Sequence, residues 1–256
     1  MKKLILISSL LAAITLAANA ATLLEADFTT MTSLPTGWTA TNGLGASGNF
    51  STNNGLKSTS WGFPIASCNL SESINLGADG EYAFKFETKY SDLNSQTAFV
   101  VAGSDFSLVV GSAYNDPVGI HAGKVDADAL GSTKYNFKAD SGNGVTGITD
   151  KTTVYSSSAP LNVWLTYDMK LTTRANGNDI LSVSIYKAGT AAAIATASYS
   201  FNSNSTLTKG GFTMDAASAK AYVKNISIKA VPEPSAFGLL AGLGALALVG
   251  ARRRRR

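Results

Sequence analysis

The chain has 256 residues and a formal net charge of +4, from 21 lysines and arginines and 17 aspartates and glutamates. Seven of the basic residues (Lys2, Lys3 and Arg252–Arg256) and one acidic residue, Glu233, lie near the ends, which leaves 14 basic and 16 acidic residues and a charge near −2 in residues 21–230. This composition argues against nucleic acid as a partner, and the single cysteine excludes an intramolecular disulfide.

Residues 1–20 have the pattern of a secretory signal peptide. Two lysines precede an apolar run, Leu4–Ala18, which ends in the small-residue step Ala18-Asn19-Ala20. A charged start, a short apolar stretch and small residues at the cleavage site are the three parts of such a peptide. We therefore expect export by the Sec machinery and cleavage between Ala20 and Ala21. A retained N-terminal anchor is the alternative.

The body, residues 21–230, shows short alternating segments without a long helical period, which predicts an all-β domain. In Tyr82–Tyr90 the even-numbered residues form an apolar face and the odd-numbered residues a polar one. Leu165–Leu171 and Leu181–Ile185 alternate in the same way around Asn176-Gly177, which predicts a hairpin. A short helix is an option at Val118–Leu130. Further strands are expected at residues 23–28, 73–76, 98–101, 106–110, 135–137, 153–155, 195–201, 211–214 and 222–229.

About a dozen strands in one domain predict two packed antiparallel sheets. Three segments also have a recognisable form: Leu34-Pro35-Thr36-Gly37-Trp38, Asn162–Tyr167 before the hairpin, and the closing strand Val223–Ile228. With the strand pattern, they resemble the concanavalin A-like, laminin-G-type jelly roll. The resemblance implies an antiparallel jelly-roll sandwich, flanked here by a signal-peptide helix and a C-terminal transmembrane helix.

Few residues of the body suggest catalysis. A Cys68 nucleophile would need His121 as its base, against the alternative of a buried thiol and a surface histidine. Glycosidases on the jelly roll use carboxylates two residues apart, and Glu25 and Asp27 have this spacing, as do Asp126 and Asp128. Neither pair completes the family's Glu-x-Asp-x-x-Glu motif, so solvated or turn carboxylates are the alternative. We expect no catalytic residue.

Calcium is the one cofactor candidate, and no metal site is complete. Asp92 with Asn94, or Asp126 with Asp128, could supply oxygen ligands.

The three tryptophans are the candidates for ligand contact. Trp38 and Trp164 stand at predicted strand starts and supply large apolar area, with sugar stacking as the alternative. Trp61 lies in the loop-like stretch Ser60–Phe63, and we select it as the candidate ligand contact.

The C-terminal segment, residues 231–256, contains three distinct blocks. Val231 leads into Pro232-Glu233-Pro234, where the prolines fix an extended backbone and prevent a helix from extending upstream. An apolar stretch at residues 235–251 would span about 25 Å as a helix, slightly less than the about 30 Å hydrocarbon core of a membrane. Five arginines follow, Arg252, Arg253, Arg254, Arg255 and Arg256, and would stop transfer and hold the C-terminus in the cytoplasm.

This order of blocks resembles the PEP-CTERM sorting signal of Gram-negative bacteria. The resemblance implies an exosortase, a membrane transpeptidase with a cysteine nucleophile, which cuts near Pro232-Glu233-Pro234. The chain would be anchored transiently in the inner membrane and then released to the cell surface or extracellular matrix. An ordinary single-pass anchor is the alternative.

The sequence thus favours an exported, non-catalytic surface or matrix protein sorted by an exosortase. A carbohydrate-binding module of the exopolysaccharide matrix is the first alternative, and a polysaccharide-active enzyme is the second.

Overall fold

The computed structural model describes residues 20–41, 44, 49–51, 54–57, 64–91, 95–113, 116–131, 135–136, 146–147, 151–154, 161–215 and 221–232. The chain divides into two compact units, one formed by Thr22–Lys229 and the other by Met1–Ala21 with Ala230–Arg256. Within the described ranges, no helix is long and apolar enough to cross a membrane. The helices expected at residues 4–18 and 235–251 lie outside those ranges.

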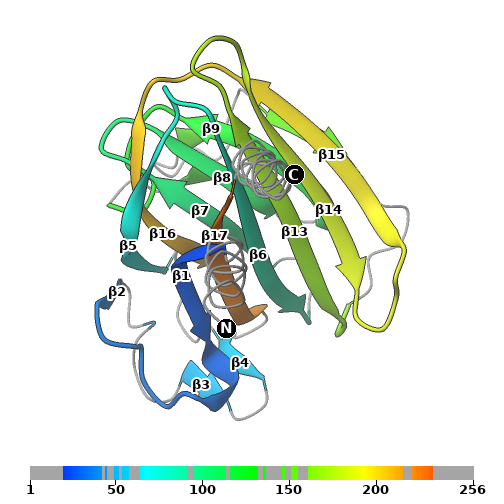
Figure 1. Ribbon diagram of the computed structural model, residues 1–256. Coiled ribbons are helices and arrows are strands. Elements are labelled where there is room, and N and C mark those ends of the chain that lie inside the picture. The colour runs from blue at the N-terminus through cyan, green and yellow to red at the C-terminus, as the bar shows by residue number, and fades with distance from the viewer. Residues whose placement is uncertain are drawn as a thin grey trace, which may run out of the picture. The chain divides into compact units, whose positions relative to one another are not determined.

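The strands form two large sheets, which Figure 1 shows as two layers. Sheet A has the order β15-β14-β13-β6-β17-β4-β3, and β1 also pairs with β17. Its strands are β1 (Ala21–Asp27), β3 (Phe50–Ser51), β4 (Gly55–Lys57), β6 (Gly80–Tyr90), β13 (Trp164–Thr173), β14 (Asp179–Lys187), β15 (Ala193–Phe201) and β17 (Ala221–Val231).

Sheet B has the order β12-β9-β8-β7-β16-β5-β2. Its strands are β2 (Trp38–Ala40), β5 (Ile65–Asn75), β7 (Gln96–Ala102), β8 (Ser107–Ala113), β9 (Asp116–Val125), β12 (Lys151–Val154) and β16 (Thr206–Asp215). A 3-10 turn, η1 (Phe28–Thr30), follows β1, and two short strands, β10 (Tyr135–Asn136) and β11 (Thr146–Gly147), pair in parallel.

The central strands of sheet A follow the predicted alternation. In β6 the even-numbered residues from Phe84 to Tyr90 are buried, and in β13 the odd-numbered residues from Leu165 to Leu171 are buried. The two strands pair antiparallel, and β13 continues into β14 around Gly177, whose φ of 133° is favourable only for glycine. The predicted strand and hairpin are therefore confirmed.

Aromatic rings from both sheets meet in the core. The ring of Phe99 on β7 lies 5.4 Å from that of Phe84 and 6.1 Å from that of Phe86, both on β6. Phe212 on β16 lies 6.1 Å from Phe86. Since β6 belongs to sheet A while β7 and β16 belong to sheet B, the sheets pack face to face, which confirms the predicted pair of packed antiparallel sheets.

The option of a short helix at Val118–Leu130 is wrong. Residues 116–125 form β9, which pairs with β8 on one side and β12 on the other, so its backbone groups are satisfied by neighbouring strands. After β9 the chain turns, and Ala129 and Leu130 join an apolar cluster with Val100 and Val109 on the face of sheet B opposite the main core. The central strands of sheet B are thus buried on both faces, a pattern that alternation cannot separate from a helix.

Candidate functional site

A row of aromatic and lysine side chains crosses the outer face of sheet A. Trp164 begins β13, and because Leu165 beside it is buried in the core, Trp164 points to the opposite face. Lys89 of β6 is its partner in register. The Lys89 Nζ lies 5.0 Å from the centre of the Trp164 ring and 4.5 Å from that of the Tyr222 ring on β17. Lys89 therefore sits between two aromatic rings from neighbouring strands.

The row continues onto a fourth strand. Lys57 of β4 pairs in register with Tyr222, so both side chains lie on the same face of the sheet. Trp164, Lys89, Tyr222 and Lys57 thus alternate as aromatic, cation, aromatic and cation across β13, β6, β17 and β4. We call these four residues the aromatic–lysine strip.

The strip holds a partly desolvated positive charge. Burial lowers the pKa of the Lys89 ammonium, and its Nζ donates a hydrogen bond of 2.9 Å to Asn54 Oδ1. Both ring faces are electron-rich and attract the ammonium. Among the described residues, no carboxylate forms an ion pair with Lys89. Within the described ranges, the partners of the Lys89 ammonium are therefore two π systems and an amide oxygen.

Glu87, the nearest acidic residue along β6, is fully engaged. Its carboxylate lies 3.3 Å from Lys85 Nζ and 3.9 Å from Lys224 Nζ, and only 15% of its side chain is exposed. Thr166 Oγ1 and Asn225 Nδ2 also donate to it, at 3.4 and 2.5 Å. Two cations and two neutral donors hold Glu87 as a structural anion beside the strip.

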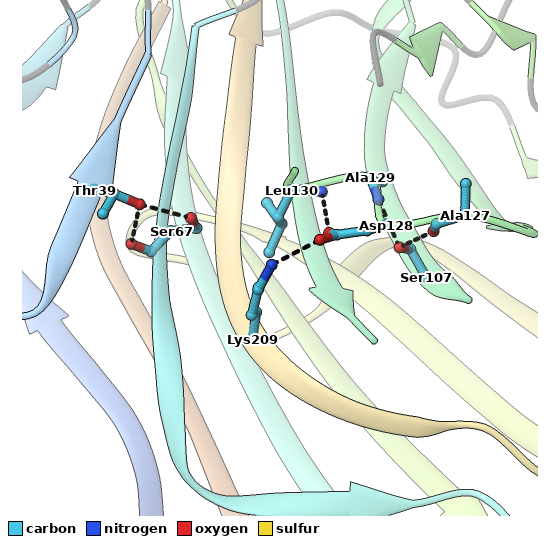
Figure 2. Close-up of polar contacts among 8 residues, drawn as sticks. All are labelled: Thr39, Ser67, Ser107, Ala127, Asp128, Ala129, Leu130 and Lys209. Atoms are coloured by element: carbon cyan, nitrogen blue, oxygen red, sulfur yellow. Dashed lines mark hydrogen bonds and ion pairs between the residues drawn. The ribbon is translucent and has the colours of Figure 1, made fainter. Parts of the chain in front are cut away.

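Asp126 and Asp128, predicted as a carboxylate pair or calcium ligands, have structural partners. Figure 2 shows Asp128 between Lys209 and the backbone of its own turn. Lys209 Nζ lies 2.7 Å from Asp128 Oδ2, and the Leu130 N–H donates to Asp128 Oδ1 at 3.0 Å. Asp126 lies 3.5 Å from Lys124 Nζ with its side chain 74% exposed. The structure thus places Asp128 as the anchor of the turn after β9.

A serine completes that turn. Ser107 Oγ of β8 accepts from the Ala129 N–H at 2.9 Å and donates to the Ala127 carbonyl at 2.6 Å (Figure 2). The turn 127–130 is therefore tied by side chains to both β8 and β16.

No group of three or more His, Cys, Asp or Glu residues that could hold a metal ion occurs within the described part of the chain. Asp92 and Asn94, the other calcium candidates, lie outside the described residues.

Glu25 and Asp27, the remaining carboxylate pair, lie exposed on β1. Glu25 Oε1 lies 3.8 Å from Lys229 Nζ. Asp27 Oδ1 accepts hydrogen bonds from Thr29 N at 2.9 Å and Thr29 Oγ1 at 2.6 Å, and these bonds lower the pKa of its carboxyl group. A general acid in a retaining glycosidase needs a raised pKa, whereas the pKa of Asp27 is lowered.

Cys68 and His121 do not meet. Cys68 lies on β5 and His121 on β9, with β8, β7 and β16 between them, so four strand spacings of about 4.8 Å separate them by about 19 Å. Burial raises the pKa of the Cys68 thiol, which keeps it protonated. His121 is 3% exposed, so the alternative of a surface histidine is wrong.

The tryptophans have different roles. Trp38 is half-buried and packs against core residues, with its ring 5.5 Å from that of Phe28 and 6.1 Å from that of Phe212, as its apolar area predicted. Trp164 begins a strand as expected, yet faces lysines on the outer surface instead of the core. Trp61, the selected ligand contact, lies outside the described residues.

The processing positions fall at the edges of the described structure. Ala20 and Ala21 are described, with Ala21 as the first residue of β1, while Ala18 is not. Val231 is the last residue of β17 and Pro232 follows it. A strand ends naturally here because proline has no N–H to donate. Glu233, Pro234 and the arginines 252–256 lie outside the described residues.

Sequence reasoning did not find Lys89, Tyr222 or Lys57. The available signal was local: Lys89 lies on the polar face of the best-predicted strand, and Tyr222 and Trp164 begin or nearly begin theirs. Which of these strands are neighbours was not visible, and that alone brings the residues together.

The structure is similar to several solved proteins, and no curated protein matches the chain in sequence. The globular domain of T. cruzi calreticulin is 12% identical with a TM-score of 0.48, covering 91% of this chain and 100% of that one. A lectin from Bauhinia forficata in complex with GalNAc is 10% identical with a TM-score of 0.46, covering 82% and 99%. A beta-1,3-glucanase from Mycobacterium marinum is 10% identical with a TM-score of 0.43, covering 81% and 98%.

One family model matches the chain, and it matches the segment that begins where β17 ends. Residues 230–255 match the PEP-CTERM protein-sorting motif, which includes Pro232, the apolar stretch and all but the last arginine. The chain therefore carries a PEP-CTERM protein-sorting motif at its C-terminus.

Proposed function

We propose that this chain is an exported, non-catalytic protein of the cell surface or extracellular matrix, sorted by an exosortase. The observation that carries the proposal is the PEP-CTERM motif at residues 230–255, placed directly after the last strand. Cleavage near Pro232-Glu233-Pro234 would release a body whose strands are all retained. In this proposal the body is a jelly-roll sandwich.

The route follows from the two ends of the chain. Residues 1–20 act as a Sec signal peptide, and residues 235–251 anchor the chain transiently in the inner membrane of a Gram-negative cell. Arg252–Arg256 remain in the cytoplasm, because five charges cannot be drawn through the bilayer. The exosortase then removes the tail and the body leaves the membrane.

Cell fractionation with mass spectrometry of the released protein tests this route. We expect a body that begins at Ala21 and ends near residues 231–234 outside the cell. Replacing Pro232 and Pro234 by alanine should leave full-length protein in the inner membrane, as should deleting the exosortase. The matched control replaces Pro35 by alanine, outside the motif, and should be released normally. Full-length wild-type protein held in the inner membrane would overturn the sorting proposal.

The proposal of a non-catalytic body is supported by the partners of its carboxylates. Asp27, Glu87 and Asp128 all receive hydrogen bonds from neighbouring groups. Incubation with a panel of polysaccharides should produce no new reducing ends and no unsaturated products. Product formation that Asp27→Asn or Glu87→Gln abolishes would identify an enzyme instead.

Carbohydrate binding is the second candidate, favoured by the aromatic–lysine strip on the outer face of sheet A. Aromatic rings beside polar groups suit sugars, which present apolar C–H faces and hydroxyl edges. Polysaccharide pull-down with and without Ca²⁺ tests this role and the role of Trp61. Absence of retention on every polymer would leave only a structural function.

A further inference from the structure

We infer that the aromatic–lysine strip on the outer face of sheet A is a binding site for an acidic, uronate-bearing polysaccharide. This inference rests on the proposed carbohydrate-binding role and names its site and ligand class. It uses Trp164, Lys89, Tyr222 and Lys57, with Lys224 beside them.

The first support is the shape of the strip. Its four residues lie side by side on β13, β6, β17 and β4, so it crosses three strand spacings, or about 14 Å. The register that aligns Trp164 with Lys89 and Tyr222 with Lys57 belongs to the sheet itself. A rigid row of alternating aromatic and charged side chains matches an extended polymer in which each sugar unit has an apolar ring face and a carboxylate.

The second support is the charge around the strip. Lys89 and Lys57 belong to it, and Lys224 Nζ lies 6.0 Å from the Trp164 ring. Glu87 is held by Lys85, Lys224 and Asn225, and Asp27 also interacts electrostatically with Lys224. Lys89 has no described carboxylate partner, so an incoming carboxylate would gain a charge-assisted hydrogen bond in a partly desolvated place.

The third support separates a polysaccharide from an anionic membrane surface. Membrane binding by a β-sheet face needs exposed apolar side chains that enter the interface. Among the described residues, Ile180 is the one large apolar side chain that is strongly exposed, and it lies on β14 near the hairpin turn, away from the strip. Half-buried rings with lysine ammonium groups beside them suit contact with an acidic sugar better than insertion into lipid.

Affinity measurements on matched polymers test the inference. The protein is the full chain with Arg252–Arg256 replaced by serine, so that these arginines do not bind the polymer. The probes are polygalacturonate, its fully methyl-esterified form, and vesicles of phosphatidylcholine with phosphatidylglycerol. We expect binding to polygalacturonate that weakens as salt increases, and at least about tenfold weaker binding to the ester.

Variants then locate the site. Lys89→Gln and Trp164→Ala should each weaken polygalacturonate binding about tenfold, as truncation of a central contact residue does. Lys57→Gln, at the end of the strip, should weaken it less. The control is Lys170→Gln, on the same face, whose Nζ is paired with Glu81 at 2.8 Å; it should bind as the parent does. Near-UV circular dichroism and the thermal midpoint establish that each variant is folded.

Each other outcome has a definite meaning. Equal binding to the methyl ester would overturn the acidic class and retain a carbohydrate module. Equal weakening by Lys170→Gln would show diffuse attraction and overturn the site. Vesicle binding that Lys89→Gln and Trp164→Ala weaken would assign the face to a lipid surface, whereas vesicle binding through the apolar residues 235–251 would be unchanged in these variants. No binding to any probe, with normal export and processing, would overturn this inference and the carbohydrate role while leaving the sorting proposal intact.

Discussion

Phe99 offers the most direct test of how the two sheets are held together. It is 1% exposed, and its ring lies 5.4 Å from Phe84 and 6.1 Å from Phe86 on the opposite sheet. Replacing a buried phenylalanine by alanine costs about 3–5 kcal/mol through lost burial and a residual cavity. Because Phe99→Ala removes two aromatic pairs at once, we expect the upper part of this range, about 4–5 kcal/mol.

For a domain of this size each kcal/mol lowers the thermal midpoint by about 2–4 °C, so Phe99→Ala should lower it by about 8–20 °C. Urea unfolding of the released body, followed by near-UV circular dichroism, measures the free energy directly. Ile180→Ala is the control: its side chain is 40% exposed, and we expect a change within about 0.5 kcal/mol.

A double-mutant cycle with Phe84→Leu and Phe99→Leu isolates the ring pair, with an expected coupling of about 0.5–1.5 kcal/mol. A loss below about 1.5 kcal/mol for Phe99→Ala, together with zero coupling, would refute the packing of β6 against β7.

Three further predictions concern a close approach, a turn and a buried acid. Gly111→Ala should destabilise the body by about 1–3 kcal/mol, measured by urea unfolding, because the added Cβ would lie 2.1 Å from a carbonyl oxygen of β7. An unchanged urea midpoint would contradict the close contact between β8 and β7 at Gly111. Asp128→Ala should lower the free energy of unfolding more than Lys209→Met does. The first change removes both the ion pair and the acceptor of the Leu130 N–H, while the second breaks only a half-exposed ion pair. Equal urea midpoints for the two variants would argue against Asp128 as the anchor of the turn. Burial raises the pKa of Asp179 above its ordinary value of 3.8 although the Arg174 N–H donates to it. The charged carboxylate therefore destabilises the fold above the raised pKa, and this destabilisation disappears as the pH falls towards 3.8. The stability gained by Asp179→Asn should accordingly be larger at pH 7 than near pH 3.5. A gain independent of pH would refute the raised pKa of Asp179.

The sequence was sufficient where the signal was local. The alternation in Tyr82–Tyr90 predicted the buried face of β6, and Asn176-Gly177 marked the turn between β13 and β14. Both depend on a period of two residues or on a single dipeptide, which neighbours along the chain determine. The C-terminal motif is equally local, and the match at residues 230–255 bears it out.

The alternation of polar and apolar residues failed to identify strands that are buried on both faces. The option of a short helix at Val118–Leu130 was wrong, and consecutive residues 121–123 of β9 are all buried, so no alternation of polar and apolar side chains is visible there. The short strands β3 and β4 were also missed, since two or three residues are too few to show a repeated alternation.

By itself, the sequence determined the strand-rich body and the C-terminal sorting motif, because these depend on composition, periodicity and the order of short blocks. Only the tertiary structure decided which exposed residues meet. Trp164, Lys89, Tyr222 and Lys57 come from four strands far apart in the chain and become neighbours through the order of sheet A. That order is set by pairing between distant segments, whose energy depends on packing across the whole core and leaves no mark on any single stretch of sequence.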